Sequence, residues 1–459
     1  MKTTKKSLLA AGISTVLLAS FNVSAKVLPE QAEKLGKELT PVGAIAAGNA
    51  EGTIPAWNPD FQPPADYKGT GSRYVDPYKD EKPLFTITAA NVQQYKGKLS
   101  PGQVKMFEAY PDTFRMDVFP SHRDGSYTDF VNENTIRNAT RAELAADGNG
   151  VVNAFGGAAF PMPNNGVEAI WNSGQAGEPI YYKRTYDDIL VYKDGTQIKG
   201  TATTERLAAF FDSRMNIAEF KEGKHPRLYY MTQIHAPTRD KGSATLVYSP
   251  VNPSIAPQSA WTYSPGVRRV RRAPTVAYDS FEGLGKFRTV DSGSGFNGAT
   301  DKYDWKLVGK RELYIPYNNY KFDSADADYK ELFPAGHANP DYVRYELHRV
   351  WEVEATLKEG ERNVFRKRVV YMDEDSWTIS VADMYDNREK LWRVILATSI
   401  NKYDVPGVAA RSYMQHDLLS KEYAADRLTN GHPLFPINDE TIKEISYFKP
   451  ASLRKLGVR

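Results

Sequence analysis

Beyond residue 180, apolar and polar side chains alternate along much of the chain, and this period of two predicts β-strands. The cleanest alternation covers residues 342–357. Its predicted apolar face carries Val343, Tyr345, Leu347, Trp351, Val353 and Leu357. Its predicted polar face carries Arg344, Glu346, His348, Glu352 and Glu354. We therefore expect a long strand with one face against the core.

Shorter stretches of the same kind predict a sheet built as a meander. They are residues 180–192, 196–204, 227–235, 243–251, 259–264, 267–272, 303–314, 362–372, 378–385 and 390–400. Asp194-Gly195 lies between the first two and is typical of a two-residue hairpin turn. An antiparallel sheet of eight or more strands with one apolar face has to bury that face under helices or around a ligand.

Helical patterns are found mainly in the first third of the chain and near its end. Helices are predicted at 29–39, 88–99, 101–110 and 133–147, one helical turn at 167–171 and a closing helix at 417–428. Residues 274–300 are rich in Gly, Ser and Asp and are expected to form a long loop. The predicted fold is mainly β, with residues 26–175 as a helical and extended region packed on a sheet formed by residues 176–459.

The first 25 residues have the layout of a secretory signal peptide. A basic start, residues 1–6, precedes an apolar stretch at 8–18, and Val23-Ser24-Ala25 supplies small residues for cleavage after Ala25. The apolar stretch is short for a membrane span. The chain of 459 residues contains no cysteine, so we expect neither disulfides nor a lipid-modified N-terminal cysteine. The mature protein is therefore expected to be a periplasmic protein without a lipid anchor.

The net charge argues against nucleic acid as a general partner. The formal charge is +3, but Lys2, Lys5 and Lys6 all lie in the predicted signal peptide, which contains no acid. The rest of the chain has 56 basic and 56 acidic residues, because 59 lysines and arginines are reduced by three. No basic excess then remains to displace counterions from phosphates.

Four arginines in five positions form the most unusual polar feature. Arg268, Arg269, Arg271 and Arg272 follow the Ser264-Pro265-Gly266 turn and fall on both faces of one predicted strand. One interpretation is a solvated strand that pairs with acids such as Glu346 or Glu352. The other is a binding site for an anion or lipid head group, because guanidinium groups suit carboxylates and phosphates.

Sequence signatures of catalysis are weak. The chain has no G-x-S-x-G, H-E-x-x-H, G-x-G-x-x-G or P-loop motif, and Gly293-Ser294-Gly295 lacks the spacing of a nucleophile elbow. His348 is expected to be solvated rather than a metal ligand. Asp373-Glu374-Asp375 lacks the ligand spacing of a calcium loop and is expected to be an acidic hairpin turn. No catalytic residue, metal site or cofactor is predicted.

Several stretches of the chain are long and distinctive: LTPVGAIAAGNAEGTIPAW (39–57), FPMPNNGVEAIWN (160–172), YSPGVRRVRRAP (263–274), YDWKLVGKRELYIPYN (303–318) and DEDSW (373–377). They resemble a family of exported bacterial proteins of unknown function, DUF1329, which is often described as outer-membrane lipoprotein-sorting-like. The resemblance implies a LolA/LolB-like fold, a curved and incomplete antiparallel barrel that binds acyl chains or other hydrophobic molecules. It also implies partners among inner-membrane exporters and outer-membrane proteins, and it supplies no catalytic residues.

Two functions are consistent with these observations. The first is a non-enzymatic carrier or chaperone for a lipid or other hydrophobic molecule in a half-barrel cavity. Its predicted ligand-binding residues are Trp261, Tyr263, Arg268, Arg269, Arg271, Arg272, Tyr345 and Trp351. The second is a structural or adaptor subunit of an exporter or outer-membrane complex, with a solid sheet and no ligand of its own. A hydrolase is a distant third, because it needs a polar cluster that only the fold can assemble.

Overall fold

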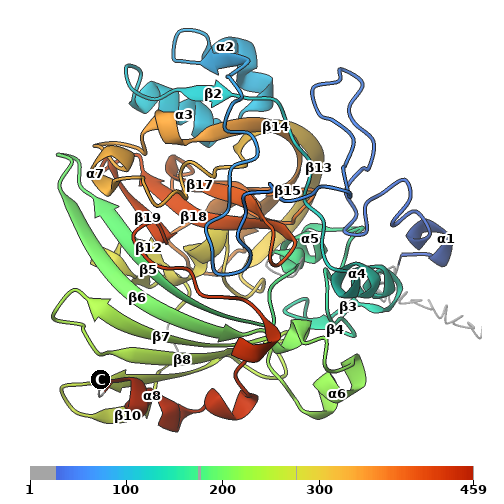
Figure 1. The fold of residues 1–459 in the computed structure, drawn as a ribbon, viewed down its shortest axis with the longest axis vertical. Coiled ribbons are helices and arrows are strands. Elements are labelled where there is room, and N and C mark those ends of the chain that lie inside the picture. Colours follow the sequence, from blue (N-terminus) through green and yellow to red (C-terminus); the bar gives the residue numbers. More distant parts are fainter. Residues whose placement is uncertain (1–26, 174–176, 275–276, 458–459) are drawn as a thin grey trace, which may run out of the picture.

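The computed structural model describes residues 27–173, 177–274 and 277–457, and its main element is an open sheet of fifteen strands (Figure 1). The predicted signal peptide lies outside the described residues. Along the sheet the strands follow the order β1-β2-β14-β15-β16-β17-β18-β19-β5-β6-β7-β8-β9-β10, and β13 pairs with β14. The prediction of a mainly β chain with a large antiparallel sheet is confirmed.

Two meanders join edge to edge to make this sheet. The first comprises β5 (Tyr181–Val191), β6 (Gln197–Leu207), β7 (Leu228–Ala236), β8 (Ala244–Ser249), β9 (Ser259–Ser264) and β10 (Arg269–Arg272). The second comprises β13 (Tyr303–Pro316), β14 (Arg344–Leu357), β15 (Lys367–Asp373), β16 (Ile379–Tyr385), β17 (Leu391–Lys402), β18 (Gly407–Asp417) and β19 (Glu422–Leu428). Antiparallel pairing of β19 with β5, for example Tyr423 with Val191, connects the end of the second meander to the start of the first.

The prediction of a closing helix at 417–428 is wrong, because this segment is the turn and second strand of a hairpin. β18 pairs with β17 on one side and with β19 on the other. Tyr423 and Ala425 are fully buried inside the sheet. Pairing on both edges outweighs the helical preference of the local sequence, since every backbone group of an inner strand needs a partner. The helix at the end of the described chain is instead α8 (Pro450–Gly457).

Shorter elements surround the sheet, and in Figure 1 those of the first third of the chain lie along its top and its right side. The helices are α1 (Pro29–Ala32), α2 (Val92–Tyr95), α3 (Pro101–Ala109), α4 (Asp129–Arg141), α5 (Gly166–Asn172), α6 (Ile217–Glu222) and α7 (Tyr329–Leu332). The short strands are β1 (Phe85–Ile87), β2 (Met116–Val118), β3 (Glu143–Leu144), β4 (Val151–Val152), β11 (Phe281–Glu282) and β12 (Arg288–Thr289). No helix in the described ranges is long and apolar enough to span a bilayer.

Both faces of the central strands are covered. On β15, Val369 and Tyr371 belong to one hydrophobic cluster, while Val370 and Met372 belong to another. The first cluster also contains residues of α3, and the second contains residues of α5 and α8. A strand buried on both faces reads as a continuous apolar run, which explains the sequence VVYM within β15. The expectation of a single apolar face therefore does not hold for these strands.

α3 is the clearest case in which local sequence sets an element. Pro101 occupies its first turn, and Ser100 forms a capping box with Gln103. α4 differs from its prediction: it begins at Asp129 after the cap Thr128 and ends at Arg141, because residues 143–144 pair with β4 instead. Helix ends depend on such pairing as well as on propensity.

Candidate ligand-binding cavity

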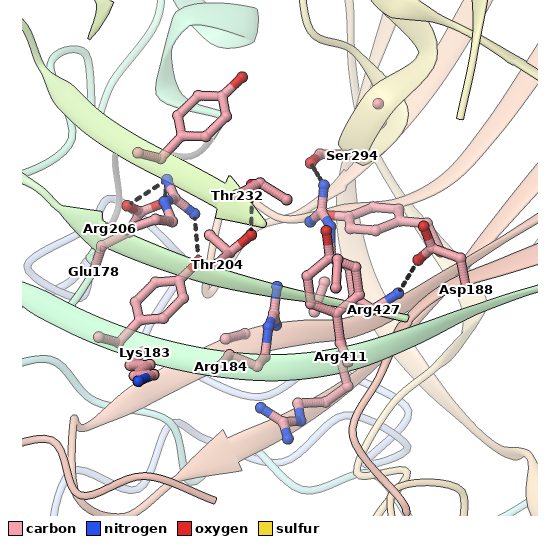
Figure 2. A pocket seen from close by; sticks show the side chains of 18 of the residues that line it. Glu178, Lys183, Arg184, Asp188, Thr204, Arg206, Thr232, Ser294, Arg411 and Arg427 are labelled. Atoms are coloured by element: carbon pink, nitrogen blue, oxygen red, sulfur yellow. Dashed lines mark hydrogen bonds and ion pairs between the residues drawn. The ribbon is translucent and has the colours of Figure 1, made fainter. Parts of the chain in front are cut away.

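Five neighbouring strands, β18, β19, β5, β6 and β7, line a cavity of about 740 Å³. Alternate residues of β5, namely Tyr182, Arg184, Tyr186 and Asp188, line it because side chains of a strand alternate between faces. The strand register brings their partners to the same face. Arg184 lies opposite Thr204 of β6, and Thr204 lies opposite Thr232 of β7, with the two threonine Oγ atoms 2.7 Å apart. Figure 2 shows this face.

Two segments outside the sheet complete the wall. Residues 282–285 and 293–297 belong to the region predicted to be a loop, which in the structure contains β11, β12 and short turns. Leu284 covers Gly200 of β6 so closely that an added Cβ would lie 3.3 Å from the Leu284 Cδ1 atom. Residues 433–435 and Ile437 form the other segment. The Lys183 ammonium lies 5.0 Å from the centre of the Phe435 ring.

The lining is more basic than acidic. Its nine cationic residues are Lys183, Arg184, Arg206, Arg227, Arg239, Arg288, Lys402, Arg411 and Arg427. Its five acidic residues are Glu178, Asp188, Asp240, Glu282 and Asp404. Apolar wall is provided by residues such as Ile234, Leu284, Phe296 and Phe435, and six tyrosines also line the cavity. The cavity is therefore amphipathic and cationic rather than uniformly apolar.

Most of the arginines have carboxylate partners. Arg206 binds both oxygens of Glu178 at 3.1 and 2.9 Å. Arg288 pairs with Asp426 at 3.0 Å, and Arg411 pairs with Asp323 at 3.0 Å. Arg427 donates to the Ser294 Oγ atom at 2.6 Å. These contacts neutralise or anchor four of the cations and fix the shape of the wall.

Arg184 and Lys402 differ from these four. Within the described part of the chain no hydrogen bond or ion pair reaches either charged group, and the Arg184 Nε atom is buried without a partner. The guanidinium of Arg184 lies over the rings of Tyr182 and Tyr186, 5.6 and 5.4 Å from their centres. Burial lowers the pKa of Arg184, and the positive charges of Arg427 and Arg411 lower it further.

Burial also lowers the pKa of Lys402, to about 8, and the charges of Arg411 and Arg184 act in the same direction. Asp404 opposes this shift, but its carboxylate is already bound by the hydroxyls of Tyr74 at 2.7 Å and Thr70 at 3.1 Å. Burial and the nearby Asp426 raise the pKa of Asp188. The electrostatics of the cavity thus leave two cations without a matched anion.

The eight predicted ligand-binding residues are not among those that line this cavity. Arg268, Arg269, Arg271 and Arg272 are exposed in and beside β10, the last strand of the sheet. Glu346 and Glu352, suggested as their partners, pair instead with Arg344 and Arg311. The remaining four lie in hydrophobic contacts: Trp261 against Tyr248, Tyr263 and Tyr345 in the buried clusters, and Trp351 against Trp377. The structure does not bring the eight together.

A local signal for the observed cavity exists in the sequence. Tyr182, Arg184, Tyr186 and Asp188 alternate with other residues, so one face of the predicted strand 180–192 carries aromatic and charged groups. The alternation in this stretch by itself predicts only one half of a hairpin. Lys402 and Arg411 carry no comparable signal, since they reach the cavity only through the pairing of β19 with β5.

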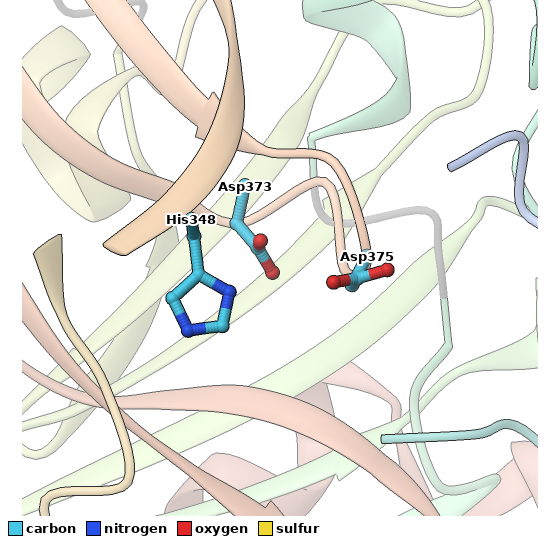
Figure 3. A group of neighbouring side chains, drawn as sticks. All are labelled: His348, Asp373 and Asp375. Carbon is cyan, nitrogen blue, oxygen red and sulfur yellow. The ribbon is translucent and has the colours of Figure 1, made fainter. Parts of the chain in front are cut away.

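A second polar cluster lies at the β15–β16 turn, where Ser376 and Thr378 also line the cavity. Donor atoms of His348, Asp373 and Asp375 lie within 4.8 Å of one another, as metal ligands would (Figure 3). The prediction that His348 is solvated is wrong, because its side chain is fully buried. The predicted acidic hairpin turn is present between the antiparallel strands β15 and β16, and its three acidic residues are buried.

Most donor atoms of this cluster are already bound within the protein. Asp375 receives two hydrogen bonds from Arg123, both of 2.8 Å. One oxygen of Asp373 accepts from Ser376 at 2.6 Å, and the His348 Nε2 atom contacts Glu346 at 3.1 Å. The His348 Nδ1 and Asp373 Oδ1 atoms have no hydrogen-bond partner among the described residues. Burial and the charge of Asp375 raise the pKa of Asp373, so its protonation relieves the same crowding of charge that a cation would.

Comparison with known proteins identifies relatives of the chain. The family model described as a protein of unknown function, DUF1329, matches residues 86–454. An uncharacterized protein of Pseudomonas aeruginosa is 42% identical over 467 residues, with 100% of both chains covered. This agreement confirms the resemblance seen in the sequence.

Solved structures give weaker similarities. A DUF1329 family protein of Desulfovibrio piger is 14% identical with a TM-score of 0.40, over 62% of this chain and 96% of that chain. A LolA superfamily protein of Nitrosomonas europaea is 11% identical with a TM-score of 0.32, over 61% of this chain and 99% of that one. Both TM-scores lie below 0.5, so the family assignment rests on the sequence match.

Proposed function

We propose, given that the chain belongs to the DUF1329 family of proteins of unknown function, that it is an exported carrier that binds a lipid or another hydrophobic or amphipathic molecule. The molecule would occupy the cavity on the face of β18, β19, β5, β6 and β7. Binding and release, without a chemical step, would then be the activity of the protein.

The cavity itself is the observation that supports this proposal most directly. Its volume of about 740 Å³ falls within the range of ordinary small-molecule sites. A sheet filled by its own side chains, as expected of a purely structural subunit, would leave no such space. Apolar residues of β7 and of the covering segments, such as Ile234, Leu284 and Phe296, offer a surface against which an apolar chain can be removed from water.

Ser294 offers a hydroxyl to the cavity from a strained turn, with φ of 56°. Its oxygen accepts a hydrogen bond from Arg427. No histidine occurs among the described residues that line the cavity, so a Ser–His pair of the kind that activates a nucleophile is not formed there. The contact of Ser294 supports a role in holding Arg427 in place.

The proposal can be tested by native mass spectrometry of the protein purified from its own envelope. Solvent extraction and lipid analysis then identify any bound molecule. We expect a bound molecule in stoichiometric amount. Ala202 lies on β6 between Tyr186 of β5 and Ile234 of β7 and faces the cavity. Replacement Ala202→Trp should fill the space and reduce the amount of bound molecule at least about tenfold, because the added indole occupies volume that the ligand needs.

The matched control is Val308→Trp, which adds an indole at an exposed position of β13 and should retain the bound molecule. A protein that is free of ligand in native spectra, and that binds no lipid added afterwards, would remove the carrier proposal. The adaptor function, which is the alternative prediction, would then be the favoured hypothesis. Capture of partner proteins from the envelope would test it directly. Equal occupancy in Ala202→Trp and the wild type would place the ligand elsewhere.

A further inference from the structure

The charge of the cavity bears on what kind of molecule it accepts. Arg184, Lys402 and Arg411 come from β5, the end of β17 and β18, and all three line the same space. Figure 2 shows Arg184 and Arg411 among the side chains that line the cavity. The three positive charges act on one another, because Arg411 disfavours the charged form of both Arg184 and Lys402. Such a group of like charges is unfavourable unless an anion joins it.

The protein does not supply that anion within its described residues. Glu178 is engaged by Arg206, and Asp404 is engaged by Tyr74 and Thr70. Asp188 accepts the backbone N–H of Arg427 at 2.9 Å. Asp323 pairs with Arg411 at 3.0 Å, which leaves Arg184 and Lys402 unmatched. A half-buried cation without a partner is costly, and a site that keeps two of them is suited to a charged ligand.

The way in which Arg184 is held agrees with this function. Tyr182 and Tyr186 lie on either side of it along β5, and its guanidinium lies over both rings. Aromatic faces position a guanidinium through cation–π attraction without using its N–H donors. These donors stay available for two oxygens of one ligand group, and the Lys402 ammonium can supply a further point charge.

We infer that the molecule carried by this protein has an acidic head group, a carboxylate or a phosphate, which binds between Arg184 and Lys402 with Arg411 beside it. This inference rests on the proposed carrier function and narrows its ligand to acidic amphiphiles. The apolar part of the molecule would contact the remaining wall. A free oxyanion shares the chemistry of the head group, so the test has to separate a head group from a small anion.

Titration calorimetry with four probes makes that separation. The probes are dodecanoate, dodecanol, acetate and inorganic phosphate, with the alkyl compounds kept below their aggregation limits. We expect dodecanoate to bind at least about tenfold more tightly than dodecanol. A tenfold difference in affinity is about what one charge-assisted hydrogen bond to the carboxylate would contribute. Acetate and phosphate should bind more weakly than dodecanoate, because they lack the apolar chain.

Variants identify the residues responsible. Arg184→Gln and Lys402→Gln should each weaken dodecanoate binding about tenfold or more and leave dodecanol binding unchanged. Arg271→Gln is the matched control, since it removes the same charge from exposed β10, and it should have no effect. Arg184→Lys retains the charge without the planar fork and should give an intermediate affinity. Thermal unfolding of each variant shows whether it is folded. If Arg184→Gln does not fold, the binding measurements on Lys402→Gln test the inference.

Each other outcome overturns a defined part of the argument. Equal affinity for dodecanoate and dodecanol would refute the acidic head group and leave the carrier function standing. Acetate or phosphate binding as tightly as dodecanoate would indicate a site for small anions instead of an amphiphile. If Arg271→Gln weakens dodecanoate binding and Arg184→Gln does not, the anion site lies at β10, where the sequence predicts ligand-binding arginines. Binding of none of the four probes, together with a ligand-free protein from the envelope, would refute the carrier function itself.

Discussion

Arg123 shows how a single buried charge can organise several segments. The residue is 2% exposed, and its guanidinium binds both oxygens of Asp375 in the β15–β16 turn. It also donates to the carbonyl oxygens of Ile45 at 2.7 Å and Pro55 at 3.1 Å. The Gly-, Ala- and Pro-rich segment 39–57 is thereby attached to the sheet although it forms almost no regular structure of its own.

Removal of Arg123 should therefore be strongly destabilising. We expect Arg123→Ala to lower the free energy of unfolding by about 3–5 kcal/mol, because Asp375 would remain buried without its partner. Denaturant unfolding followed by circular dichroism measures this change. The control is Arg137→Ala, whose exposed pair with Glu133 on α4 is worth only about 0–1 kcal/mol. Similar losses in both variants would contradict the role assigned to Arg123.

Lys402 gives the ligand site a predicted dependence on pH. Its pKa is lowered to about 8, chiefly by burial, so the folded protein loses this positive charge as the pH rises through that value. Arg184 and Arg411 keep their charges there, and Glu178 and Asp404 are the acids that face Lys402. We expect the affinity for dodecanoate to fall between about pH 7 and pH 9, because the Lys402 ammonium loses its charge in this range. Dodecanoate itself stays ionised throughout and does not contribute to the change.

Lys402→Arg tests the origin of this dependence. An arginine stays protonated over the whole range, so the variant should bind dodecanoate with an affinity that changes little between the two pH values. Calorimetric titrations at each pH, on wild type and variant, provide the comparison. An unchanged pH profile in Lys402→Arg would assign the effect to another group.

At the scale of elements, α3 is attached to the sheet by the groups at its N-terminus. Asp383 of β16 is fully buried and accepts hydrogen bonds from the Ser100 hydroxyl at 3.0 Å and the Gly102 N–H at 2.9 Å. Gln103 also reaches the Tyr314 carbonyl oxygen of β13 at 2.7 Å. The helix thus covers β16 and β13 through polar contacts as well as through Met106 and Phe107, which are buried in the same hydrophobic cluster.

Gly102 leaves no room for a side chain at this junction. An added Cβ would lie 2.0 Å from an Asp383 oxygen and 2.9 Å from a Val394 methyl group. We expect Gly102→Ala to lower the free energy of unfolding by about 1–3 kcal/mol, as overpacking does. Gly97→Ala is the control, because nothing lies within 4 Å of its added Cβ. Equal stability of the two variants in urea unfolding would show that α3 can shift without cost.

At the scale of the whole molecule, an open sheet has to protect its edges. β10 is the last strand in the order, and Arg269, Arg271 and Arg272 on it are exposed. Charged side chains on an edge strand discourage pairing with another chain. This offers a structural reason for the arginines that is compatible with, and independent of, a head-group site.

Replacement of two of these arginines tests the edge function. We expect Arg269→Thr together with Arg271→Thr to promote self-association, detected by size-exclusion chromatography with light scattering, because threonine favours strand pairing and removes the repulsion. Lys34→Thr with Arg137→Thr removes the same charge from an exposed turn after α1 and an exposed position of α4 and should leave the protein unassociated. If the edge variant does not self-associate, the arginines need another explanation, and the predicted head-group site becomes the first candidate.

The sequence alone determined those features that depend on neighbours along the chain. Alternation predicted most strands, Asp194-Gly195 predicted the β5–β6 hairpin, and Pro101 predicted the start of α3. Long shared stretches identified the family, which the match over residues 86–454 confirms. These signals are local, because a strand period, a turn and a helix cap each involve only a few consecutive residues.

Only the tertiary structure decided which strands became neighbours and which charges came together. Residues 422–428 became an inner strand because β18 and β5 both pair with it. That pairing brings Lys402 and Arg411 to the face that carries Arg184, and no spacing in the sequence announces it. Conversely, His348 looked solvated from its charged neighbours along β14 but is buried by the second layer of side chains. Burial and charge balance are sums over contacts distant in the chain, so they follow from the fold rather than from any local pattern.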